Sequence, residues 1–162
     1  MAIRKMRIMG DPILRERSKE VKEMTGRTQK LIADMADTMY DQDGVGLAAV
    51  QVGVLKKIVT IDIGEGLHVF INPEILETSG EQTGPEGCLS VPGKNGDVTR
   101  PDYVKVRALD ENMEEFILEG EGLMARAICH EFDHLEGRMY VDLVKGPLRD
   151  NEIDGYGNRE EE

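Results

Sequence analysis

The sequence predicts an α+β fold in which mostly antiparallel sheets pack around a helix of the C-terminal half, with a second helix near the N-terminus. Residues 25–41 and 123–136 carry apolar side chains at the three-to-four-residue spacing of amphipathic helices. The segments between them are short, rich in β-branched residues and bounded by Gly and Pro. Because helices and strands do not alternate along the chain, parallel βαβ units are not expected.

The first predicted helix spans residues 25–41. Thr25 or Thr28 can cap its N-terminus with a side-chain oxygen, and the turn at Asp43 and Gly44 should end it. Its apolar face consists of Leu31, Ile32, Met35, Ala36 and Met39. A glycine-containing apolar segment, GVGLAAVQVG, follows at 44–53.

The middle of the chain predicts strands. Residues 56–62 and 67–73 are β-branched stretches of strand length. Residues 103–110 and 114–120, joined by a polar turn, predict a hairpin. The second helix should run over 123–136 and end at Gly137, which suits a helix C-terminus.

Length and composition indicate one domain with a tail. The 162 residues, 40% of them hydrophobic, suffice for a single core. From Gly146 onward the apolar pattern is lost, and six acidic residues accompany two basic ones. We therefore expect a domain over 1–148 and an acidic, disordered tail over 149–162.

Charge and hydropathy exclude several classes of protein. No apolar run approaches the roughly 20 residues of a membrane-spanning helix, and the N-terminus lacks the apolar stretch of a signal peptide, so a cytoplasmic location without membrane contact is expected. The net charge of −12 argues against direct nucleic-acid binding. In a reducing compartment Cys88 and Cys129 should remain thiols.

The strongest chemical signal is the sequence HEFDH at 130–134. On a helix, two residues four apart lie about 40° apart around the axis, so His130 and His134 can bind one metal ion. Glu131 lies on the adjoining side of the same turn and can reach a metal-bound water. These two imidazoles require a third protein ligand, because catalytic sites of this kind usually have three.

The residues themselves leave the third ligand open. Tyr140 occupies the position where one metalloprotease pattern has a third His. Glu152 is acceptable by sequence distance but lies in the predicted tail. Cys88, in EGCLSVPG, offers a thiolate that binds zinc or iron well. An endopeptidase using Glu152, and a non-catalytic protein with a closed four-ligand shell, therefore remain alternatives to a hydrolase that uses Cys88.

Three segments in this order, GVGLAAVQ (44–51), EGCLS (86–90) and HEFDH (130–134), resemble the signature segments of the peptide deformylases. The likeness extends from about residue 7 to about residue 148, so 1–148 is identified as a catalytic domain of this type. It implies removal of the formyl group from the N-terminal formylmethionine of nascent polypeptides. Water activated by the metal would attack the formyl carbonyl.

The resemblance also assigns roles to individual residues. It implies metal binding by Cys88, His130 and His134, proton transfer by Glu131, and oxyanion contacts from the Gln51 side chain and the Leu89 backbone N–H. One divalent ion is implied, Fe²⁺ natively, with Zn²⁺, Ni²⁺ or Co²⁺ in purified protein. The segments lining the substrate would include Val45, Gly46, Leu123 and Ala127.

The expected partners are N-formylmethionyl peptides, with transient proximity to the ribosome. An acidic tail stands where some bacterial members have a long C-terminal helix, so docking through a basic helix is not expected. Arg100 and Arg126 can hold a carboxylate within the fold or face bound peptide, and we expect the structural role. For Cys129 we expect a buried, inert position.

Overall fold

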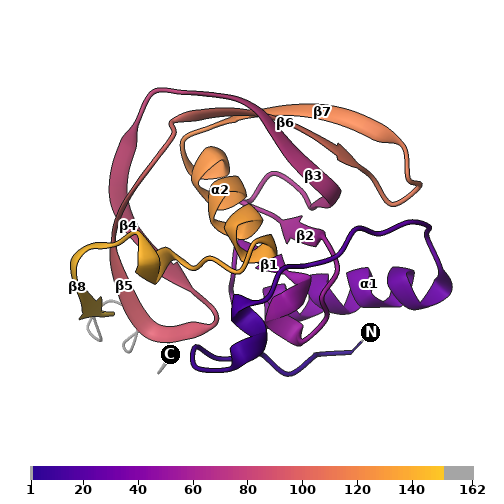
Figure 1. The fold of residues 1–162 in the computed structure, drawn as a ribbon, viewed down its shortest axis with the longest axis horizontal. Coiled ribbons are helices and arrows are strands. Elements are labelled where there is room, and N and C mark those ends of the chain that lie inside the picture. Colours follow the sequence, from indigo (N-terminus) through magenta and orange to yellow (C-terminus); the bar gives the residue numbers. More distant parts are fainter. Residues whose placement is uncertain (1, 152–162) are drawn as a thin grey trace.

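The structure is a computed structural model that describes residues 2–151, and its architecture is α+β with antiparallel sheets (Figure 1). Strands β1 (Gly46–Ala48), β2 (Ile58–Ile61), β3 (His68–Ser79), β6 (Tyr103–Leu109) and β7 (Glu115–Glu121) form one sheet in the order β1-β2-β3-β6-β7. Strands β4 (Gln82–Cys88), β5 (Val91–Arg100) and β8 (Lys145–Asp150) form a second sheet in the order β4-β5-β8. Every pair of neighbouring strands in these sheets is antiparallel, as predicted.

The described residues contain two α-helices, at the predicted places. Helix α1 spans Gly26–Asp41, and the Thr25 side chain accepts a hydrogen bond from the backbone N–H of Thr28. Helix α2 spans Leu123–Leu135. Short 3-10 helices lie at Pro12–Arg15 (η1), Ala49–Val52 (η2) and Tyr140–Asp142 (η3). None of the helices between residues 2 and 151 is long and apolar enough to cross a membrane.

Helix α2 occupies the centre of the fold, between the two sheets (Figure 1). It packs against β1, β2 and β7 of the first sheet and against β5 of the second. Ala125 and Ile128 are fully buried, and Phe132 meets Phe70 of β3 edge to face at a ring-centroid distance of 5.6 Å. Strands from both sheets pack against α2, so the position of the helix between the sheets is fixed.

Two regions differ from the sequence-based prediction. The hairpin of β4 and β5 was not predicted, because its strands contain several Gly and Pro residues that are typical of loops. Strand β8 includes Arg149 and Asp150, so the predicted boundary at residue 148 falls inside a strand and the expectation of a loose tail is wrong for these two residues. The remainder of the predicted tail, 152–162, lies outside the described residues.

Candidate metal centre

His130 and His134 lie on the same face of helix α2, as their spacing predicts. Both side chains are buried, and their ring centroids lie 5.1 Å apart. The helix stops just after His134 because Gly137 has a positive φ of 78°. A Cβ at Gly137 would lie 2.4 Å from the carbonyl oxygen of Arg15, so only glycine allows this close approach to η1.

Cys88 belongs to the second sheet, and its side chain lies close to the two imidazoles of α2. It is the last residue of β4 and pairs with Val91 across the two-residue turn of Leu89 and Ser90. Its Sγ lies 3.4 Å from His134 Nε2, and one ligand atom from each of Cys88, His130 and His134 lies within 4.8 Å of the others. This donor set, one thiolate and two imidazoles, fits a zinc or iron ion.

The other candidates for a third ligand are placed differently. Tyr140 is buried in η3, where its ring stacks on that of His130 at a centroid distance of 6.0 Å. Glu152 lies outside the described residues. Within the described residues, Cys88 is therefore the group that completes the cluster.

Glu86 orients the His130 ring through its Nδ1 nitrogen. This role was not predicted from the sequence. One carboxylate oxygen, Oε2, lies 2.5 Å from His130 Nδ1, which leaves the Nε2 nitrogen free to face Cys88 and His134. A carboxylate behind a metal-binding His fixes the tautomer and the ring orientation. The available signal was the position of Glu86 two residues before Cys88, at the start of the EGCLS segment.

Two buried arginines hold Glu86 in place. Arg100 donates to both carboxylate oxygens at 3.1 and 2.6 Å, and Arg126 donates to Oε1 at 2.8 Å. Burial alone would raise the pKa of Glu86, but the hydrogen bonds from His130 and Arg100 lower it to about 2. Arg100 also donates to Asp133 of α2 at 2.8 Å. Both arginines therefore hold a carboxylate within the fold, as expected.

The two imidazoles differ in their surroundings. Burial lowers the pKa of His134 well below its ordinary value, which favours the neutral ring that binds metal ions. Burial also acts to lower the pKa of His130, but the nearby Glu131, Cys88 and Glu86 reverse the direction and raise it. Cys129, next to His130, is buried as expected, and burial raises its pKa to about 11.

Glu131 is buried beside the cluster. Its Oε2 lies 3.8 Å from His130 Nε2, and its Oε1 has no hydrogen-bond partner among the described residues. Burial raises the pKa of Glu131 to about 7. A Cβ on Gly46 of β1 would lie 2.7 Å from Oε2, so the glycine leaves the space that the carboxylate fills. Such a group can accept a proton and release it near neutral pH.

Gln51 and Leu89 flank Cys88. Gln51 lies in η2, where its Oε1 accepts a hydrogen bond from the Ala48 backbone N–H at 3.0 Å. This contact directs the Gln51 Nε2 toward Ser90 Oγ, at 3.1 Å, and toward Cys88 Sγ, at 3.6 Å. Leu89 lies in the turn immediately after Cys88 and lines the same pocket.

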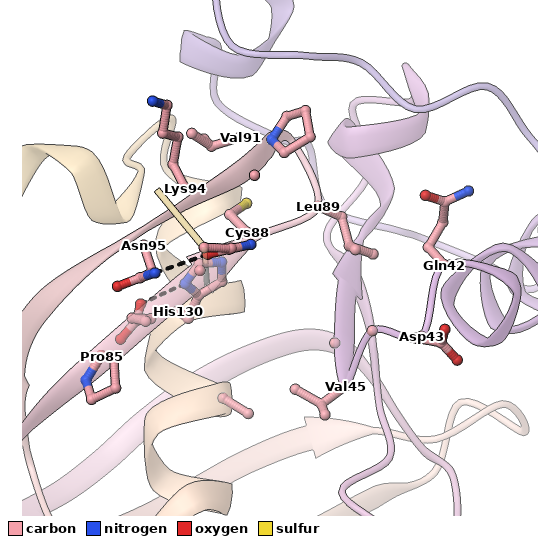
Figure 2. A pocket seen from close by; sticks show the side chains of 18 of the residues that line it. Gln42, Asp43, Val45, Pro85, Cys88, Leu89, Val91, Lys94, Asn95 and His130 are labelled. Atoms are coloured by element: carbon pink, nitrogen blue, oxygen red, sulfur yellow. Dashed lines mark hydrogen bonds and ion pairs between the residues drawn. The ribbon is translucent and has the colours of Figure 1, made fainter. Parts of the chain in front are cut away.

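The cluster opens into a pocket of about 990 Å³ (Figure 2). The residues predicted to contact substrate, Val45, Gly46, Leu123 and Ala127, all line it. Val45 and Leu123 are 43% and 52% exposed, which is high for apolar side chains and leaves both available to a ligand. A further wall was not predicted, because it comes from β5 and from the segment assigned to the tail: Lys94, Asn95, Arg149, Asp150 and Asn151.

A Cys/His₂ cluster with a buried carboxylate beside it, at the base of an open pocket, is the arrangement of a mononuclear metallohydrolase. Comparison with known proteins identifies the family. Residues 3–149 match the family described as Polypeptide deformylase. Similar relatives include a peptide deformylase of Agathobacter rectalis, 60% identical over 93% of this chain and 95% of the relative, and one of Lachnoclostridium phytofermentans, 58% identical over the whole of both.

Solved structures agree with the sequence relatives. The peptide deformylase of Thermotoga maritima superposes with a TM-score of 0.88 at 39% identity, over 90% of this chain and all of that one. That of Legionella pneumophila gives 0.86 at 45% identity, over 89% and 87%. The chain therefore belongs to the polypeptide deformylase family, a family of metal-dependent hydrolases.

Proposed function

We propose that this chain removes the formyl group from the N-terminal formylmethionine of nascent polypeptides, using a metal ion held by Cys88, His130 and His134. The observation that carries the proposal is the convergence of these three ligand atoms within 4.8 Å at the base of the pocket that also holds Glu131. The substrates are N-formylmethionyl peptides. The enzyme acts in the cytoplasm and meets these chains close to the ribosome.

Iron(II) is the proposed native ion, and zinc, nickel or cobalt takes the same place in purified protein. The thiolate of Cys88 and the two imidazoles suit all of these ions. When bound, the ion supplies Lewis-acid activation, which lowers the pKa of water from 15.7 to about 7. Glu86 contributes by keeping His130 Nε2 directed at the ligand cluster.

Glu131 moves the proton. It removes a proton from the attacking water and delivers it to the amine nitrogen as the C–N bond of the formamide breaks, so the products are formate and a free amino terminus. A pKa of about 7 places the carboxyl group between its two forms near neutral pH. The space left by Gly46 allows the carboxylate to face the pocket.

Gln51 and Leu89 stabilise the negative charge that develops on the formyl oxygen. The Gln51 amide is oriented before substrate arrives, because Ala48 and Ser90 hold its two ends. The Leu89 backbone N–H lies next to Cys88 in a tight turn. Loss of one such donor typically costs about 3–4 kcal/mol of transition-state stabilisation.

The substrate lies along the apolar part of the pocket. Gly46 begins β1, which is an edge strand of the first sheet, and Val45 just before it is exposed, so this edge can pair with the peptide backbone. Leu123 and Ala127, on the first turns of α2, provide an apolar surface for the methionine side chain.

The direct test is Glu131→Gln. Formate release from a formyl-Met-Ala peptide should fall by about 10²–10⁴-fold, because the amide cannot take the proton. Metal analysis of the anaerobically purified variant should show the same stoichiometry as the native protein. Turnover equal to that of the native enzyme would remove Glu131 from the mechanism.

A second variant distinguishes this reaction from that of an endopeptidase whose third metal ligand is Glu152. Cys88→Ala should lose the bound metal and the formate-release activity together, because the thiolate supplies one of three ligands. Glu152→Ala is the matched control and should keep both. Metal retained in Cys88→Ala and lost in Glu152→Ala would contradict the proposed ligand set.

A further inference from the structure

The charges of this chain are unevenly distributed along the sequence. Residues 1–57 contain 11 of the 20 basic residues and 8 of the 32 acidic ones, whereas residues 58–162 contain 9 basic and 24 acidic residues. The N-terminal third is therefore positive in a strongly acidic protein. Such a separation creates a local positive field that attracts anions.

Part of this positive charge converges on a second cavity, remote in sequence from the ligand cluster. It has a volume of about 400 Å³ and is lined by Arg4, Arg27, Leu31, Val54 and Lys56. Three segments build it: the N-terminal segment, the first turns of α1, and the chain between η2 and β2. None of these residues lines the pocket of the metal centre.

The segments are held in place by specific contacts. The Arg4 backbone N–H donates to Thr38 Oγ1 at 2.8 Å, and its side-chain Nε donates to Asp34 at 2.9 Å, which ties the N-terminal segment to α1. Lys56 Nζ donates to Thr28 Oγ1 at 3.2 Å, which ties the third segment to the same helix. The cavity is therefore a built feature of the fold.

The cations around the cavity outnumber their carboxylate partners. Asp34 pairs with both Arg4 and Lys30. Among the described residues, Arg27 and Lys56 have no carboxylate within ion-pair distance, and neither Glu nor Asp lines the cavity. The floor is apolar, because Leu31 is buried and Val54 is half-buried. Like charges facing one cavity repel each other unless an anion lies between them.

We propose that this cavity binds a phosphate-bearing molecule of about nucleotide size. The Arg27 guanidinium and the Lys56 ammonium match a phosphate, which accepts paired hydrogen bonds from arginine. The apolar floor of Leu31 and Val54 suits the base or another flat, weakly polar part of the ligand. The volume lies within the range of about 300–1,000 Å³ that is usual for small-molecule sites. The phosphate comes either from a free nucleotide or from a nucleotide of an RNA strand.

Calorimetric titration of the metal-loaded, full-length protein tests the proposal with three probes: inorganic phosphate, AMP and a short single-stranded RNA. AMP should bind, and more tightly than phosphate because of the apolar floor. Arg27→Gln and Lys56→Gln should each weaken AMP binding by about tenfold. Lys22→Gln is the matched control, because Lys22 is an exposed cation of the same region that does not line the cavity.

Formate release separates this site from the metal centre. All three variants should keep the native turnover, so a failure of the proposed reaction would not be confused with a failure of this site. Tighter binding of RNA than of AMP, with the same dependence on Arg27 and Lys56, would identify RNA as the source of the phosphate. The proposal is overturned if no probe binds at millimolar concentration, or if both cavity variants bind as the native protein does.

Discussion

Glu131 meets two opposing demands. Its proposed role needs a carboxyl group that ionises near neutral pH, and burial provides this by raising the pKa to about 7. The same burial makes the ionised form unfavourable in the folded protein, because little solvent or hydrogen bonding compensates the charge. Catalytic use of this residue should therefore reduce stability when no metal ion is bound.

A neutral substitution should reveal this conflict. The folded-state pKa of Glu131 lies above the unfolded value of 4.5, so the carboxyl group destabilises the folded metal-free protein as pH rises through that interval. Glu131→Gln should therefore raise the unfolding free energy by on the order of 3 kcal/mol at about pH 8, and by much less at about pH 5. Urea unfolding of the metal-free proteins measures both. An equal effect at the two pH values would contradict the assigned cause.

At the scale of elements, Glu86 joins three of them. It lies on β4, Arg100 lies on β5, and Arg126 and His130 lie on α2. These residues place Cys88, two positions further along β4, opposite the imidazoles of α2. The network therefore holds the proposed metal ligands in position, and it also joins the second sheet to helix α2.

Glu86→Gln should weaken metal binding by about 10–100-fold, because the amide no longer fixes the His130 tautomer. Competition with a chromophoric chelator for zinc gives the affinity without using the reaction. Glu74→Gln is the control, since Glu74 is an exposed carboxylate paired with Arg107. An unchanged zinc affinity in Glu86→Gln would limit Glu86 to a structural role.

Strand β8 should contribute measurably to the free energy of unfolding. Leu148 packs against the core, and β8 pairs with β5 next to the pocket. Truncation after Val144 should lower the free energy of unfolding by on the order of 1–3 kcal/mol, whereas truncation after Asn151 should leave it unchanged. Thermal unfolding of both truncated chains tests the predicted domain boundary. Equal stability of the two would place the boundary before β8.

At the scale of the whole molecule, acid should unfold this protein partly through Glu86. Its folded-state pKa of about 2 lies below the unfolded value of 4.5. Its contribution is therefore fully present above about pH 4.5 and is lost as pH falls toward 2, by on the order of 3 kcal/mol. Urea midpoints across this interval should decline less steeply in Glu86→Gln than in the native chain. Parallel declines would assign the acid sensitivity to other carboxylates.

Local patterns explain why the helices could be predicted. Residues 25–41 and 123–136 carry their own periodicity, with Thr25 capping the first helix and Gly137 following the end of the second. HEFDH places two imidazoles on one helix face without help from the rest of the fold. The β4–β5 hairpin has no comparable signal, because its Gly and Pro residues are typical of loops and its strands are held by pairing. Strand β8 was missed for the same reason.

The sequence by itself determined the fold class, the helical pair of histidines and the resemblance that placed Cys88 beside them. Only the tertiary structure decided that the Cys88 sulfur, 46 residues from His134, lies 3.4 Å from its ring, that Glu86 orients His130, and that β8 forms a wall of the pocket. The physical reason is the range of the interactions. Helix periodicity and capping act between residues a few positions apart, whereas these contacts form only when separate sheets close around α2.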